Sequence, residues 1–256
     1  MSKLFETSTI NGLKLPNRFM RSATWEGLAA DDGTCTPELK DFYIELAKGD
    51  VGLIITSHTY VRPEGMGSPR QLGLSDDKFI AGLRDLTAAI HRYDTPIAVE
   101  LAHAGILSNP KVTNLTPMVV SKVEGYVGSD GREMTTQDIQ EIIEAFGQAA
   151  RRAKEAGFDA IQIHGAHGFL VNQFLSPAFN QRADAYGGSI ENRCRALLEI
   201  LASMRRHVGD NFPILIKLNS EDMIDGGLTV GDSLQAALML QDAGIDAIEL
   251  SGGTVV

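Results

Sequence analysis

The sequence predicts an α/β fold, a TIM (β/α)8 barrel of which about six βα units are present, with residues 1–256 forming a single domain. Two observations support this prediction. Short apolar strands, polar loops and amphipathic helices alternate along the chain, and such βα units require parallel strands joined by helical crossovers. No GxGxxG motif follows any of these strands, which argues against a doubly wound dinucleotide-binding sheet.

In chain order, we expect an N-terminal β-hairpin lid and then six strands. The hairpin is predicted within residues 3–16, around Asn11 and Gly12, because both residues tolerate the positive φ of a tight turn. Helices between the strands should end near glycines, as in the near-copies KEAGFDAIQI and QDAGIDAIEL, because glycine admits the left-handed helix cap. The predicted strands are 18–23, 51–57, 97–102, 158–163, 213–218 and 245–250.

Six strands leave the predicted barrel open. A closed barrel needs two further βα units, so we interpret the sequence as a barrel domain that lacks its last two units. A natural six-stranded relative is the alternative. It is disfavoured because it would leave the edges of the first and sixth strands unpaired.

Composition excludes several classes of partner. The net charge is -10 with no run of Lys or Arg, so no nucleic acid or anionic membrane surface is expected as a partner. The N-terminus lacks the apolar core of a signal peptide and no segment is apolar for long enough to span a bilayer, which predicts a cytoplasmic protein. Cys35 and Cys194 form no CxxC pair, so a disulfide framework or a metal–thiolate cluster is unsupported. The expected partner is a small-molecule substrate, and a homo-oligomer is possible.

Functional groups of a βα barrel gather at the carboxyl ends of its strands. After the first strand come Ser22, Ala23 and Thr24, which are small enough to let a planar ligand approach the backbone. Trp25 follows, and it either stacks on a ligand or simply packs. The second strand ends at Ser57, which is followed by His58. A histidine at a strand end is as often a hydrogen-bonded core residue as a functional one.

Two charged residues lie inside otherwise apolar strands: Glu100 in IAVELAHAG and Lys217 in PILIKLNSED. Each needs a partner, since an uncompensated buried charge costs several kcal/mol. One interpretation is a direct ion pair between them inside the barrel. The other is that Lys217 faces a ligand that becomes anionic, such as the N1–C2=O edge of a reduced flavin. Glu100 would then accept a hydrogen bond from the ring or fix the lysine.

His164 and His167 close the fourth strand, and three interpretations are open. They are structural histidines with satisfied hydrogen bonds, or they are metal ligands with help from His58, His103 and Glu100. In the third interpretation, two imidazole N–H groups bind the oxygen of a carbonyl or phenolate. Such a pair polarises an α,β-unsaturated substrate towards attack at its β-carbon.

Several segments occur in a specific order: LPNRFMRSAT, GLIITSHTYV, LAHAG, REMTTQDI and HGAHGFLVNQFLSPAFNQRADAYGGSIENR. With them the sequence resembles the Old Yellow Enzyme family of FMN-dependent NADH:flavin oxidoreductases and ene-reductases across essentially its whole length. The resemblance implies a (β/α)8 barrel that holds FMN non-covalently at its carboxyl end. It also implies that NADH or NADPH reduces the flavin, which then passes hydride to an activated alkene.

The resemblance further assigns residues to the cofactor. Glu100 stands where the family usually has a glutamine at the pyrimidine edge of the flavin, and Lys217 where a basic residue faces N1. The backbone after the first strand, and that near Ser57 and His58, would meet the ring. The implied cofactor-binding residues are Ser22, Ala23, Thr24, Ser57, Glu100 and Lys217, and no metal is implied.

For the substrate, His164 and His167 match the catalytic pair that holds the substrate oxygen over the ring. Trp25 and Phe169 are expected to face the substrate. Phe169 stands where the family usually has the tyrosine assigned as proton donor, so water or another residue must serve. In the family the loops after strands seven and eight hold the FMN phosphate, so weak or absent FMN binding is expected from these 256 residues alone.

Alternative functions stay open. A related flavoenzyme, such as a dienoyl-CoA reductase or an oxidative demethylase with extra C-terminal domains, would share the same motifs. A metal-dependent barrel hydrolase would use the histidine cluster. A catalytically silent barrel fragment would only fold or assemble with a partner.

Overall fold

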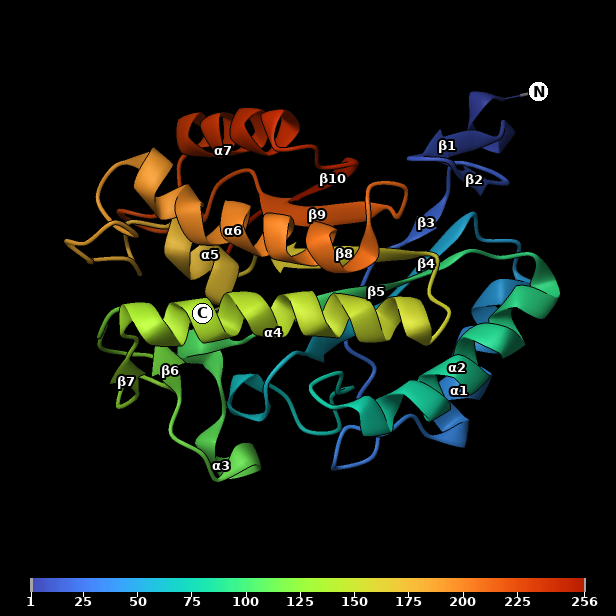
Figure 1. Cartoon of the computed structure of the whole chain (residues 1–256), viewed down its shortest axis with the longest axis horizontal. Helices are drawn as coiled ribbons and strands as arrows, with labels where there is room; N and C mark the ends of the chain where they lie inside the picture. Colours follow the sequence, from blue (N-terminus) through green and yellow to red (C-terminus); the bar gives the residue numbers. More distant parts are fainter. Residues whose placement is uncertain (1, 256) are drawn as a thin grey trace.

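A computed structural model describes residues 2–255. Its centre is a six-stranded parallel sheet with the strand order β10-β9-β8-β5-β4-β3. Helical crossovers lie between the long strands, so these are βα units of the predicted barrel (Figure 1). The strands are β3 Met20–Arg21, β4 Leu53–Tyr60, β5 Ile97–Ala102, β8 Ala160–Gly165, β9 Ile214–Asn219 and β10 Ala247–Ser251.

The long helices cover the outer face of this sheet. Figure 1 shows α4 and α6 side by side across the sheet, and the two helices contact each other. A capping box of Thr135 and Asp138 begins α4, and Gly157 (φ 84°) follows its last turn, as predicted for the KEAG segment. The helices are α1 Pro37–Lys48, α2 Ile80–Ile90, α4 Thr136–Glu155, α6 Ile190–Val208 and α7 Val230–Asp242.

The N-terminal hairpin closes the amino end of the sheet. Its strands β1 (Ser8–Ile10) and β2 (Leu13–Leu15) pair antiparallel around Asn11 (φ 43°) and Gly12 (φ 81°), which confirms the predicted turn. Leu15 is buried in a small cluster with apolar side chains from the first halves of the barrel strands. Residues Lys3–Phe5, predicted as part of the hairpin, form a short 3-10 helix instead.

Alternation along the strands separates two faces. On β5, Val99 and Leu101 belong to the outer cluster that packs against the helices, whereas Ala98 belongs to the inner cluster above the hairpin. Glu100 shares the inner face, and the register sets it beside Gln162 of β8. The interior is therefore apolar near the hairpin and polar towards the carboxyl ends of the strands.

The structure corrects two predictions about local structure. The first strand, expected over 18–23, is only Met20–Arg21, so the segment from Ser22 to Ala30 has no regular secondary structure. The polar loop expected after the fourth strand contains a buried helix, α5 (Leu170–Leu175). Short elements complete the chain: α3 Pro110–Thr113, β6 Met118–Val119, β7 Arg132–Glu133 and 3-10 helices at Pro63–Gly65, Asp77–Phe79, His91–Tyr93 and Gly105–Leu107.

The sheet is open between β3 and β10, which within residues 2–255 form its two edges. A hollow of about 310 Å³ lies there, bordered by the hairpin, by Phe19 and Met20 before and in β3, and by Ile248 in β10. On α7, Val230, Leu234 and Leu238 are more than half exposed at helical spacing. Across residues 2–255, no helix combines the length and the apolar character needed to cross a membrane.

Candidate active site

A charged cluster lies on the inner face, formed by the buried side chains of Glu100 and Lys217 and the partly buried side chain of Glu249. The Lys217 Nζ atom lies 3.0 Å from Glu100 Oε2 and 3.9 Å from Glu249 Oε2. The side chains of Lys217 and Glu100 are 4% and 2% exposed, so this is a desolvated ion pair. The structure therefore contains the Glu100–Lys217 pair that was one of two interpretations of the sequence.

Glu249 was not among the predicted site residues. It accepts hydrogen bonds from Gln162 Nε2 (2.7 Å) and from Ser22 Oγ (2.6 Å). The Ser22 bond links the loop after β3 to β10 across the open side of the sheet. A signal for this was present in the sequence, because Gln162 and Glu249 occupy the same position in the near-copies KEAGFDAIQI and QDAGIDAIEL. Glu249 also lies inside an otherwise apolar strand, and the same feature identified Glu100 as a candidate site residue.

Histidines and a phenylalanine form the next layer, at the carboxyl ends of β4 and β8. The ring of His164 lies 5.3 Å from that of His167 and 4.3 Å from that of Phe169, between ring centroids. His58 packs edge-on against Phe169 at 5.2 Å and lies 6.3 Å from His164. The structure thus brings both predicted catalytic histidines, Phe169 and His58 together.

Burial controls the charge of this layer. It lowers the pKa of His58 to about 4, and it lowers the pKa of His164 well below 6.5, with Lys217 and His167 adding to the effect. The pKa of His167 is also lowered, chiefly by burial. Burial raises the pKa of Glu100 although Lys217 opposes the shift. At neutral pH each imidazole is neutral and therefore offers one N–H donor and one acceptor.

Four buried polar atoms in and beside the cluster have no hydrogen-bond partner among the described residues: His58 Nε2, Glu100 Oε2, Gln162 Oε1 and His164 Nδ1. Glu100 Oε2 has its ion contact with Lys217, and His164 Nδ1 lies 3.8 Å from the same oxygen, beyond hydrogen-bond distance. Buried polar groups in folded proteins are nearly always paired, so a group of unpaired atoms in one place indicates a ligand or ordered water. The nearby Lys217 supplies a cation. A planar ligand with hydrogen-bonding edges and an anionic form, which is the chemistry of a flavin ring, fits this set of donors and acceptors.

The segment after β3 borders the cluster. Ala23 contributes its backbone oxygen, which lies 3.4 Å from Lys217 Nζ, and Thr24 Oγ1 donates to Ser22 O at 3.3 Å. Trp25 is 45% exposed and its ring lies against Gly27, so it is not part of the buried cluster.

Ser57 is buried at the predicted strand end, but its backbone N–H donates to Tyr43 Oη at 3.0 Å. Its carbonyl oxygen accepts from Thr59 Oγ1 at 3.0 Å. Both backbone groups of Ser57 therefore have partners within the protein. β4 continues to Tyr60, beyond the predicted end of the strand, and the next residue along it, His58, has an unpaired atom in its side chain.

The histidines do not form a metal site in this structure. Among residues 2–255, no three or more His, Cys, Asp or Glu side chains are arranged so that they could hold a metal ion. His103 lies apart from the cluster, with its ring against Gly65 and its Nδ1 accepting from Gly105 N at 3.0 Å.

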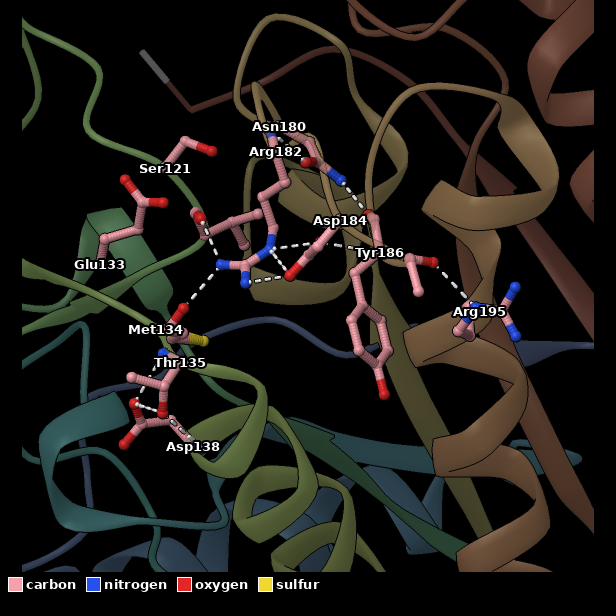
Figure 2. Close-up of polar contacts among 12 residues, drawn as sticks. Ser121, Glu133, Met134, Thr135, Asp138, Asn180, Arg182, Asp184, Tyr186 and Arg195 are labelled. Carbon is pink, nitrogen blue, oxygen red and sulfur yellow. Dashed lines mark hydrogen bonds and ion pairs between the residues drawn. The ribbon is translucent and has the colours of Figure 1, made fainter.

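The residues NQRADAYGG (180–188), after α5, have a structural role. Figure 2 shows Arg182 between Met134 and Asp184. The Arg182 side chain is 7% exposed and pairs with Asp184, and it donates to the backbone oxygens of Met134 at 2.7 Å and of Val120 at 3.2 Å. Asn180 Nδ2 donates to Tyr186 O at 2.7 Å (Figure 2). These contacts fix the loop that leads to α6, so the residues of NQRADAYGG hold the backbone and do not reach the charged cluster.

Comparison with known proteins agrees with this geometry. Residues 3–256 match the NADH:flavin oxidoreductase / NADH oxidase family. The chain belongs to this family. It is 40% identical over 253 residues to a protein named NADH oxidase from Thermoanaerobacter brockii; the aligned region covers 98% of this chain and 39% of that protein. It is 41% identical over 254 residues to a protein named NADPH dehydrogenase from Geobacillus sp. (strain WCH70), covering 99% of this chain and 74% of that protein.

Solved structures of similar fold support the barrel architecture. A complex of 2-naphthoyl-CoA reductase superposes with a TM-score of 0.94 at 29% identity, covering 99% of this chain and 41% of that one. An old yellow enzyme homologue from Zymomonas mobilis superposes with a TM-score of 0.90 at 27% identity, covering 99% of this chain and 74% of that one. The six strands of this family member are therefore a part of a (β/α)8 barrel, which confirms the predicted fold class.

Proposed function

We propose that the protein is part of an FMN-dependent oxidoreductase that takes hydride from NADH or NADPH and passes it to an α,β-unsaturated carbonyl compound. The observation that carries the proposal is the buried inner layer in which Lys217, Glu100 and unpaired ring atoms of His58 and His164 converge. Family membership supports the choice of flavin over other planar ligands. The proposed place of action is the cytoplasm.

The cofactor would be held by the inner layer and the segment after β3. Lys217 would place its ammonium group against the N1–C2=O edge of the ring, with Glu100 fixing the lysine, while Ser22, Ala23 and Thr24 approach the ring with their backbone. When bound, the flavin supplies two-electron hydride chemistry. A buried ammonium group stabilises negative charge far more than an exposed one does, because little water screens it.

The two histidines would bind the substrate oxygen. Both imidazoles are neutral, so each can donate one N–H to a carbonyl or phenolate without a proton leaving the protein. Withdrawing electrons from the carbonyl makes the β-carbon of an enone more electrophilic. The ring of Phe169 packs on His164 and keeps water from that face, but a phenyl group has no proton to give. Proton delivery to the α-carbon must therefore come from water or from another side chain.

The chain spans 39% of the length of the Thermoanaerobacter relative and 74% of the Geobacillus relative. We propose that the FMN phosphate is bound by residues beyond those of this sequence, in βα units that would join the open edges β3 and β10. The exposed edge, the hollow beside it and the apolar face of α7 support this proposal.

A second candidate is reduction of an unsaturated acyl-CoA by a larger relative of the same barrel. It is favoured by the similarity to the 2-naphthoyl-CoA reductase, of which this chain covers 41%. Oxidative demethylation is a third reaction compatible with the same buried layer. Neither a metal-dependent hydrolase nor a silent fragment is supported by a comparable observation.

Binding of a phenol tests the leading proposal. In flavin-loaded protein, a phenolate held over the ring by the two histidines should give a charge-transfer band. Replacing His164 or His167 with Ala should weaken phenol binding by about 1–3 kcal/mol, the cost of losing a hydrogen bond to a charged partner. A matched control is His103→Ala, because His103 is buried but lies apart from the cluster. Unchanged bands in both site variants would reject the oxygen-binding assignment.

A further inference from the structure

The backbone of His167 adopts an unusual conformation. Its φ is 60°, in the left-handed region that residues other than glycine rarely occupy, and Gly168 follows with a φ of 79°. Such a conformation persists only where the surroundings hold it. Two side-chain oxygens do so: Asn219 Oδ1 accepts from His167 N at 3.3 Å, and Asn172 Oδ1 accepts from Gly168 N at 2.7 Å.

A single carboxylate lies behind both asparagines. Asp222 is fully buried, and its Oδ1 accepts from Asn172 Nδ2 and from Asn219 Nδ2, each at 2.9 Å. Its Oδ2 accepts from Leu228 N at 2.8 Å. Since a carboxylate only accepts hydrogen bonds, both amide NH2 groups must face Asp222. Both amide oxygens are thereby turned towards the N–H groups of His167 and Gly168.

Other contacts fix the side chain of the same histidine. His167 Nε2 lies 2.6 Å from Ser251 Oγ at the end of β10, and His167 O accepts from Val255 N at 3.2 Å. Asn219 Nδ2 also donates to Gly253 O at 2.9 Å, which ties the loop after β10 to the same network. The network joins α5, the end of β9 and the loop after β10 around one catalytic candidate.

We propose that Asp222 is a positioning residue, which holds His167 in its left-handed backbone conformation by fixing the orientation of the Asn172 and Asn219 amides. The carboxylate touches neither His167 nor the ligand layer, and it acts through the two asparagines. The part of this inference that concerns substrate binding rests on the proposed function. The part that concerns the backbone of His167 does not.

The test is the isosteric substitution Asp222→Asn. An amide in place of the carboxylate offers one oxygen and an NH2 group, so it cannot accept from Asn172, Asn219 and Leu228 as the carboxylate does. At least one of the Asn172 and Asn219 amides then loses the hydrogen bond that fixes its orientation. We expect the amides of His167 and Gly168 to exchange with deuterium about tenfold faster, and the His167 ring resonances in NMR spectra to shift.

The matched control is Asp232→Asn. Asp232 also anchors the start of α7, where it accepts from Thr229 Oγ1 at 3.0 Å and pairs with Arg193 at 2.8 Å, but it makes no contact with the His167 network. It should lower stability without changing exchange at His167 and Gly168. If Asp222→Asn does not fold, Asn219→Ser is measured in the same way.

Equal exchange at His167 and Gly168 in the wild-type protein and in the site variant would overturn the proposal. The same increase in both Asp222→Asn and the control would also overturn it, because the effect would then be general loosening. These measurements need no flavin and no substrate. Their failure is therefore distinguishable from failure of the proposed function.

Discussion

The buried ion pair between Lys217 and Glu100 should show a marked asymmetry between its two single substitutions. In Lys217→Met, the Glu100 side chain is left 2% exposed without its cation. Leaving one charge of a buried pair uncompensated costs about 3–5 kcal/mol of unfolding free energy. In Glu100→Gln, by contrast, Lys217 keeps Glu249 at 3.9 Å and Ala23 O at 3.4 Å. That loss should be smaller, about 1–2 kcal/mol, the scale of one lost hydrogen bond.

The double variant Glu100→Gln/Lys217→Met removes both charges together. No buried charge is then left without a partner, so its loss should be well below the sum of the single losses, by about 2–4 kcal/mol. The assay is urea unfolding at pH 7, followed by circular dichroism, for the wild-type protein and the three variants. Additive losses, or a Lys217→Met loss no larger than that of Glu100→Gln, would refute the account of this cluster.

Three further predictions follow from the structure. Burial lowers the pKa of His58 and of His103 from 6.5 to about 4, so between these pH values only the unfolded chain binds a proton at these two residues. The unfolding free energy should therefore fall by up to about 3 kcal/mol per histidine as the pH decreases from 6.5 to 4. In urea unfolding measured over this pH range, His103→Gln should make the unfolding free energy depend less on pH. Phe169→Tyr should speed the oxidative half-reaction with an enone in flavin-loaded protein, measured by stopped flow; no gain would place proton delivery elsewhere. Leu234→Lys on the exposed face of α7 should reduce any self-association seen in sedimentation, whereas an unchanged association would assign it to another surface.

The sequence predicted the five strands after the first one well, because each is an apolar run between the end of a helix and a polar loop. It also identified Glu100 and Lys217, since a charge in an apolar strand is visible without a structure. Contacts between distant segments were not predictable in this way. The bond from Ser22 to Glu249 depends on the curvature that brings the two edges of the sheet near each other.

The Asp222 network shows the same limit. Asn172, Asn219 and Asp222 are ordinary polar residues in the sequence, and only the fold places all three out of contact with water. The helix α5 was overlooked for a different reason. Its apolar residues follow directly on a polar turn, and six residues are too few for a helical period to be distinguished from a buried loop.

Flavin binding by the 256-residue chain tests the central claim most directly. FMN and riboflavin carry the same ring, and only FMN carries the phosphate, so a fluorescence titration with both separates a ring site from a phosphate site. The account predicts weak binding of both, with dissociation constants within about tenfold of each other, and weaker binding of both by Lys217→Met. Flavin binding that Lys217→Met leaves unchanged would contradict the ring site. Stoichiometric FMN binding about a thousandfold tighter than that of riboflavin would contradict the location proposed for the phosphate site.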